Sequence, residues 1–185
     1  PLSQKDERAQ HIKNILNTAV GETLQVGLLN GPKGTAILKR QSDDGLEFDF
    51  TWQDEEEPAL DPITLVVGLS RPHTNQKILQ QATTLGVRKM LFVRTELGEG
   101  SYAASKLWST GEYKQHLIHG AQQAGSTRIP KVEYGSPMWI AMHLVEDSPQ
   151  KIALHNGEDV QPFTQLELDR DKEIVLAIGS ERGWT

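Results

Sequence analysis

Residues 174–185 read IVLAIGSERGWT, and this stretch decides how the chain folds. The apolar, β-branched run 174–178 predicts a short, fully buried strand. The glycine-bracketed loop 179–183 follows at once, which is how many α/β proteins present backbone N–H groups to a ligand. Thr185 is a good helix N-cap, but the sequence stops there. We therefore expect a ligand loop in an α/β domain, and a chain that is a fragment of a longer protein.

Working backwards from this stretch, strands and helices alternate from Pro62 onward. Glycine stops at Gly86 and Gly125 close two of the helical patterns, and Thr74 is the expected cap of the first. The pattern predicts strands at 63–69, 87–93, 132–134, 151–155 and 174–178, and helices at 75–85, 114–124 and 137–144. Strands that are apolar on both faces and alternate with helices predict a mostly parallel sheet with helices on each side.

The first 53 residues have a different pattern. A helix is expected to begin near Ser3 and Asp6 and to end at Gly21, with one apolar face formed by Ile12, Ile15, Leu16 and Ala19. Strands are expected at 22–30, 35–39 and 46–52, the last with Leu46, Phe48, Phe50 and Trp52 on one face. The acidic segment 54–61 is interpreted as a linker. The domains predicted are a small β-barrel-like module at 1–53, the linker at 54–61, and an α/β domain at 62–185.

Composition narrows the class of protein. The 185 residues contain no cysteine, which excludes disulfides, thiolate nucleophiles and cysteine zinc sites and fits a cytoplasmic protein. No apolar run approaches the length of a membrane span, and the N-terminus has no signal-peptide pattern. The net charge is −6, yet residues 70–131 hold nine basic and three acidic residues, a net +6 against −12 elsewhere. Charge segregated in this way predicts an anionic partner for that block, or an ordinary solvated surface.

Few residues suggest chemistry by themselves. His116 and His119 share a helical face but lack a third ligand, so no metal site is expected. Neither a nucleophile elbow nor a dinucleotide-binding fingerprint is present, and no catalytic base can be identified. Arg71 follows the first α/β strand and Arg128 precedes Ile129, while loop 154–157 follows the penultimate strand. If the last two strands are parallel, loops 154–157 and 179–183 emerge at one edge and can share a ligand. Each glycine loop is also explained as a tight turn.

At this point four motifs, in order, make the chain resemble the RsmE-type methyltransferases of small-subunit ribosomal RNA, in the knotted SPOUT superfamily. They are RAQHIKNIL…GETLQV (8–26), SRPHTNQKILQQATTLGV (70–87), AQQAGSTRIPKV (121–132) and LAIGSERGW (176–184). The resemblance implies an N-terminal PUA-like, RNA-binding barrel at 1–53. It further implies a SPOUT methyltransferase domain at 62–185, apparently truncated before the trefoil knot is completed.

The resemblance also implies an activity and a site. Members of the family transfer a methyl group from S-adenosylmethionine to N3 of a uridine in 16S rRNA, and work as homodimers in ribosome biogenesis. By resemblance, cofactor-binding residues would be Leu154, His155, Asn156, Gly157, Ile178, Gly179, Ser180, Glu181, Arg182 and Gly183. RNA-binding residues would be Arg71, Lys106 and Arg128, whose guanidinium and ammonium groups suit phosphate or an ionised uracil.

The chain departs from the family pattern at several positions. Ser180 replaces the proline of the cofactor-loop signature, and Arg182 replaces one of its glycines. Further departures are Gln122, Ser126 and Tyr113. These differences and the net acidity of the chain each keep one alternative open. One is a divergent RNA-binding relative that does not methylate, and the other is a small-molecule-binding α/β protein unrelated to RNA.

Overall fold

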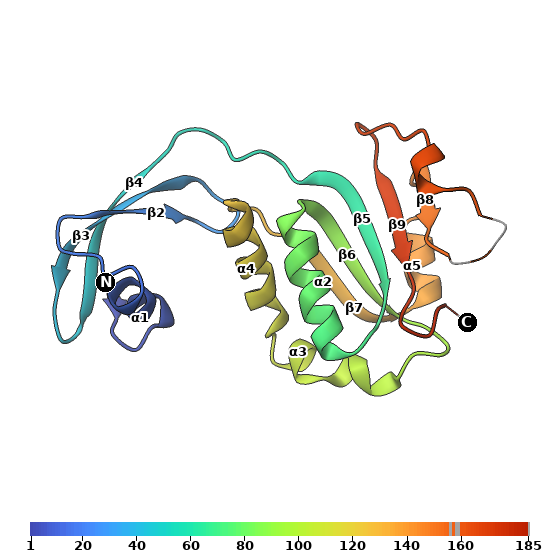
Figure 1. Cartoon of the computed structure of the whole chain (residues 1–185), viewed down its shortest axis with the longest axis horizontal. Helices are drawn as coiled ribbons and strands as arrows, with labels where there is room; N and C mark the ends of the chain where they lie inside the picture. The colour runs from blue at the N-terminus through green and yellow to red at the C-terminus, as the bar shows by residue number, and fades with distance from the viewer. Residues whose placement is uncertain (156, 158–159, 185) are drawn as a thin grey trace. The chain divides into compact units, whose positions relative to one another are not determined.

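The computed structural model describes residues 1–155, 157 and 160–184, and the chain forms two compact units, Pro1–Pro58 and Ala59–Thr185 (Figure 1). The division falls inside the acidic segment 54–61. The first unit contains β1 (Leu2–Ser3), α1 (Glu7–Asn14), β2 (Thr23–Gly27), β3 (Lys33–Gln41) and β4 (Gly45–Trp52). The second contains β5 (Asp61–Gly68), α2 (Pro72–Thr84), β6 (Val87–Arg94), η1 (Gly100–Ala104), α3 (Lys106–Ser109), α4 (Tyr113–Ala124), β7 (Lys131–Pro137), α5 (Met138–Leu144), β8 (Gln150–Ala153), η2 (Phe163–Gln165) and β9 (Ile174–Ile178).

Helix α1 is shorter than the sequence pattern predicts. Asp6 caps it by accepting a hydrogen bond from the Arg8 backbone N–H at 2.9 Å, as expected for a carboxylate at this position. The helix ends at Asn14, because Asn17 takes a left-handed conformation with φ of 50° and stops it before Gly21. The predicted apolar face is therefore wrong beyond Ile12. Ile15 is 67% exposed and Leu16 is 50% exposed.

The first unit is an antiparallel sheet in the order β1-β4-β3-β2. Its small core joins Ala9 of α1 to Leu38 of β3 and Leu46 of β4, with Phe48 packed against them. The alternation of β4 predicts that Phe50 and Trp52 continue this apolar face. They do lie opposite the small residues Ala36 and Gly34, but Phe50 is 54% exposed and Trp52 is 41% exposed.

The second unit is a five-stranded sheet in the order β7-β6-β5-β9-β8, and every strand pair in it is parallel. This confirms the predicted mixed α/β class, with a small antiparallel module followed by a parallel sheet. Because the strands are parallel, all of their carboxyl ends lie at one edge of the sheet, the carboxyl edge, and all of their starts lie at the other, the amino edge. The final strand differs from expectation, since only Val175 of β9 is buried and its other residues are half-buried.

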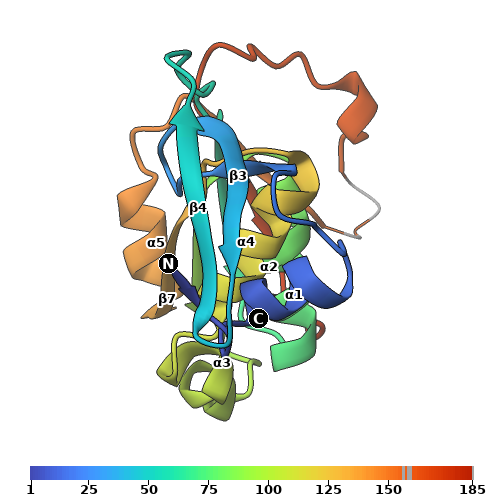
Figure 2. The ribbon, with the colours of Figure 1, turned by 90° about the vertical axis from the view of Figure 1, so that its left-hand side faces the viewer.

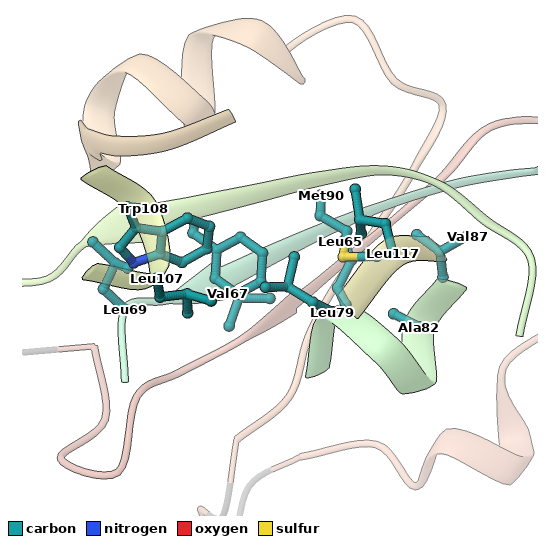
Figure 3. Packing of buried hydrophobic residues seen from close by; sticks show 11 residues of the cluster. Leu65, Val67, Leu69, Leu79, Ala82, Val87, Met90, Leu107, Trp108 and Leu117 are labelled. Carbon is teal, nitrogen blue, oxygen red and sulfur yellow. The ribbon is translucent and has the colours of Figure 1, made fainter. Parts of the chain in front are cut away.

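Helices cover both faces of this sheet. Figure 2 shows α5 on the opposite side from α2 and α4. Helix α4 crosses α2 closely at Gly120, where an added Cβ would lie 2.4 Å from the Gln80 carbonyl oxygen. The larger core cluster lies between these helices and the strands. Figure 3 shows it running from Leu69, Leu107 and Trp108 at one end to Val87 and Ala82 at the other.

Helix α2 begins two residues before its predicted cap. Pro72 occupies the first turn with Arg71 as the N-cap, instead of Thr74. Proline is favoured there because its missing N–H is not needed and its φ is already helical. Helix α4 ends as predicted, at Gly125 with φ of 62°. The early start of α2 brings its N-terminus to the exit of β5, at the carboxyl edge.

Candidate functional site

The loop after β9 is a tight turn closed by the residues at its two ends. The Gly183 N–H donates to the Ser180 carbonyl oxygen at 3.0 Å, and the Ser180 hydroxyl donates to the Gly183 carbonyl oxygen at 3.0 Å. Gly183 has φ of 83°, which glycine adopts without strain, whereas Arg182 has no such positive φ. Serine at 180 and arginine at 182 therefore fit this turn, and the glycine that the backbone requires is present.

This turn lies directly against the end of β5. A Cβ added at Gly68 would be 2.5 Å from the Ser180 backbone nitrogen and 3.1 Å from Thr95 Cγ2. Only glycine permits this approach. Thr95, at the exit of β6, is 9% exposed, and its hydroxyl has no hydrogen-bond partner among the described residues. A buried hydroxyl without a partner is uncommon in proteins and is available to a ligand group.

Glu181 joins the β9 loop to the start of α2. Its carboxylate accepts a hydrogen bond from the Arg71 backbone N–H at 3.1 Å. Burial alone would raise the pKa of Glu181, but this hydrogen bond, with the nearby Ser70 hydroxyl and Arg71 charge, lowers it overall. The turn that presents Arg71 is itself fixed by Asn75, which is fully buried and donates to the Ser70 carbonyl oxygen at 2.8 Å. The carboxylate thus lies, ionised, at a helix N-terminus.

The two predicted loops emerge side by side. Strands β8 and β9 are paired in parallel register, and the Leu154 N–H donates to the Ala177 carbonyl oxygen at 2.9 Å. This confirms the geometric condition under which loops 154–157 and 179–183 can share a ligand. Leu154 is 42% exposed, and the His155 ring lies close over Gly157. Asn156, the remaining predicted residue of that loop, lies outside the described residues.

The structure separates the predicted RNA-binding residues. Arg71 follows β5 at the carboxyl edge, and the exposed Lys106 opens α3, whose Trp108 packs with Leu69 near that edge (Figure 3). Arg128 instead precedes β7, whose first residue Lys131 is in register with Lys89 near the start of β6. Arg128 therefore lies at the amino edge, away from the glycine loop, because it enters its strand where Arg71 leaves one.

Several residues of the site were missed from the sequence. Gly68 gives the clearest overlooked signal, since a glycine inside an apolar strand run marks a close backbone approach. Thr95 and Asn75 carry no local signal, because their roles depend on contacts between segments far apart in the chain. Arg94 was counted only as part of the basic block, although it ends β6 at the same edge as Arg71.

Other candidate features do not form a site. His116 lies 3.7 Å from the Glu112 carboxylate, and its ring centroid is 6.4 Å from that of His119. Within residues 1–155, 157 and 160–184, no group of three or more acidic or histidine side chains could hold a metal ion. No helix in the same part of the chain is long and apolar enough to cross a membrane.

Comparison with known proteins bears on this site. A family model described as "RNA methyltransferase domain" matches residues 55–185. The ribosomal RNA small subunit methyltransferase E of Treponema pallidum is 34% identical over 189 aligned residues, which cover this whole chain and 71% of the relative. The chain belongs to the small subunit methyltransferase E family of RNA methyltransferases.

Two further members of this family are also similar to this chain. The small subunit methyltransferase E 1 of Borreliella burgdorferi is 27% identical, over all of this chain and 76% of its own length. A crystal structure of the Neisseria gonorrhoeae methyltransferase E, bound to S-adenosyl methionine, superposes with a TM-score of 0.74 at 22% identity. The superposition covers 97% of this chain and 74% of the Neisseria protein, and it supports the SPOUT methyltransferase fold.

Proposed function

We propose that this chain methylates small-subunit ribosomal RNA, transferring a methyl group from S-adenosylmethionine to N3 of a uridine in 16S rRNA. The observation that carries the proposal is the 34% identity, along the whole chain, to a small subunit methyltransferase E. The geometry of the carboxyl edge supports it. Parallel α/β sheets place ligands beyond the carboxyl ends of their strands, and the glycine turn lies there.

The residues at this edge fit the cofactor. Leu154 and Ile178 would offer apolar contact to the adenine ring, since they leave adjacent strands β8 and β9. The turn from Gly179 to Gly183 would bind the polar parts of S-adenosylmethionine through its backbone N–H and carbonyl groups. Beside this turn, the buried Thr95 hydroxyl has no hydrogen-bond partner among the described residues, and Gly68 lets β5 approach the turn closely. His155, Asn156 and Gly157 complete the proposed cofactor set.

For this methyl transfer, the protein has to position the two reactants and stabilise charge. Bound S-adenosylmethionine supplies an electrophilic methyl group on a sulfonium. The uracil N3 must lose its proton and face that methyl group in line. Arg71 would stabilise negative charge on the uracil or a neighbouring phosphate, and the hydrogen bonds of Glu181 and Asn75 to the turn that presents it support this role. Lys106 would contact the RNA backbone on the same side.

The altered cofactor loop is compatible with an active enzyme. Ser180 closes the turn with its hydroxyl, and Arg182 imposes no backbone strain. This geometry favours methylation over a relative that only binds RNA. RNA contacts by Arg128 and by the first unit, and assembly as a homodimer, are further parts of the proposal that rest on the resemblance.

The test is methyl transfer to small ribosomal subunits that lack the modification. This chain would be incubated with them and with S-adenosylmethionine carrying a labelled methyl group, and the 16S rRNA digested to nucleosides. We expect the label in 3-methyluridine. Label in another nucleoside would contradict the N3 assignment, and no label in 16S rRNA would contradict the proposed function. Bovine serum albumin in place of this chain controls for non-enzymatic methylation.

A further inference from the structure

The carboxyl edge extends beyond the cofactor loop, as a row of cations on consecutive strands. Arg94 ends β6, Arg71 follows β5, and Arg182 lies in the loop after β9. Neighbouring strands are about 4.8 Å apart, so three side chains of this length can follow a nucleic-acid backbone. The Arg182 guanidinium donates to the Leu97 carbonyl oxygen at 3.4 Å, which brings the exits of β6 and β9 together.

Among the described residues, no ion pair within 4.0 Å joins the guanidinium group of Arg71, Arg94 or Arg182 to a carboxylate. The Glu181 carboxylate is engaged by the Arg71 backbone instead. A row of arginines whose guanidinium groups form no ion pair within 4.0 Å is suited to phosphate.

An exposed tryptophan lies at the end of this row. Pro137, the N-cap of α5, is in register with Arg94 on the neighbouring strand. Trp139 follows two residues later and is 70% exposed. Water-exposed indole is costly, and an exposed aromatic beside cations is the usual means of holding an unpaired base.

We propose that Trp139 stacks an unpaired nucleobase of the RNA substrate, while Arg94 contacts the adjoining phosphate. The inference rests on the proposed function for its substrate class and adds where the RNA lies. The strand runs along the carboxyl edge from the cofactor loop, over β5 and β6, to the start of α5. The enzyme therefore selects RNA that is single-stranded next to the target uridine, since a paired base has no free face for Trp139.

The experiment measures binding of a short, fluorescently labelled unpaired RNA by anisotropy, with the same sequence in a duplex for comparison. Trp139→Leu keeps an apolar side chain and removes the stacking face, so we expect affinity for the unpaired RNA to fall about 5- to 20-fold. Trp139→Tyr should retain most of it. Arg94→Gln should lower the slope of log affinity against log salt by about one. S-adenosylmethionine affinity, measured by calorimetry, should not change in any of these three variants.

Two matched variants separate this role from others. Leu85→Ala removes a 74% exposed apolar side chain after the last turn of α2, and should leave RNA binding unchanged. Met142→Gln alters the next turn of α5, and should also leave it unchanged. Equal RNA affinity of Trp139→Leu and wild type would overturn the inference. So would a change in oligomeric mass in both Trp139→Leu and Met142→Gln, since α5 would then be a contact between copies. Wild type that binds unpaired RNA but neither binds nor uses S-adenosylmethionine would refute the proposed function alone.

Discussion

The two edges of the parallel sheet use charge in opposite ways. At the amino edge, Arg88 pairs with Glu173 at 2.8 Å and Lys89 with Glu133 at 2.9 Å. At the carboxyl edge, Arg71 and Arg94 have no carboxylate partner within 4.0 Å among the described residues. Within one sheet, the charged groups at the amino edge form ion pairs with each other, whereas the two arginines at the carboxyl edge remain available to solvent or a ligand.

Hydrogen bonding differs in the same way. At the amino edge, Glu173 accepts from the Ser148 hydroxyl at 2.7 Å, the Thr64 hydroxyl at 3.1 Å and the Arg88 guanidinium. At the carboxyl edge, Thr95 keeps a buried hydroxyl without a partner within the described part of the chain. The polar groups at the amino edge therefore join neighbouring segments of the fold, whereas the carboxyl edge leaves a buried hydroxyl that the proposed ligand would engage.

The largest effect should come from adding a side chain where β5 packs directly against the glycine turn. Gly68→Ala would place a Cβ 2.5 Å from the Ser180 nitrogen. We expect the free energy of unfolding to fall by about 1–3 kcal/mol, the usual range for overpacking, and S-adenosylmethionine affinity to fall at least roughly tenfold. Thermal denaturation with and without the cofactor measures both. Gly100→Ala is the control, because nothing lies within 4 Å of its added Cβ. Equal loss in the two variants would contradict a specific role for Gly68.

A smaller effect is expected from the link between the cofactor loop and α2. Glu181→Gln removes the negative charge that accepts from the Arg71 N–H. We expect methyl transfer to slow by roughly tenfold, the cost of one charged hydrogen bond, with little change in melting temperature. Glu99→Gln, in the loop that leads to η1, is the control. If Glu181→Gln lowers the melting temperature and activity together, Glu181 belongs to the structural network and the contrast between the edges weakens.

Acid should weaken the amino edge through Glu173. The hydrogen bond from the Ser148 hydroxyl contributes most to lowering the pKa of Glu173 below its usual value of 4.5. Thr64 and Arg88 lower this pKa further, and burial opposes the shift. A lowered pKa stabilises the fold above the unfolded value, and this stability is lost as pH falls through the folded pKa. We expect Glu173→Gln to cost roughly 1 kcal/mol at pH 7, since the group is partly exposed, and to flatten the stability curve below pH 4.5.

Urea denaturation between pH 3 and pH 7 checks this, with the exposed Glu167→Gln as control. Unchanged acid sensitivity in Glu173→Gln would show that other carboxylates govern it.

The smallest effect is expected at the second amino-edge ion pair. Lys89→Gln removes the contact with Glu133, but both side chains are partly exposed. Ion pairs of this kind contribute about 0–1 kcal/mol, so the unfolding midpoint in urea should barely move. A loss above about 2 kcal/mol would mean that the amino edge depends on this pair far more than its exposure indicates.

Much of this architecture was predictable from the sequence. Apolar runs such as 63–69 and 87–93, with glycine stops at Gly86 and Gly125, predicted the parallel α/β unit. Boundaries were less accurate where one residue's backbone decided them. Asn17 ended α1 early, and Pro72 started α2 before Thr74. Phe50 is 54% exposed, because alternation along one strand predicts which face a side chain takes but not what covers that face.

The site was predictable only in part. A strand followed by a glycine loop located residues 179–183, and the parallel pairing of β8 and β9 placed loop 154–157 beside it. The sequence analysis did not assign Arg128 to an edge. Arg128 precedes a parallel strand and Arg71 follows one, so the two lie at opposite edges of the sheet. Contacts such as Glu181 to Arg71 join residues 110 positions apart, and only the folded chain reveals them.

The most direct test of the account is a calorimetric titration of this chain with S-adenosylmethionine. We expect saturable binding of one cofactor per chain, which weakens in Gly68→Ala and is unchanged in Lys89→Gln. Such a result would place the cofactor at the carboxyl edge. Wild-type chain that releases or absorbs no heat, or binding that Gly68→Ala leaves unchanged, would contradict the claim that this edge is the methyl-donor site.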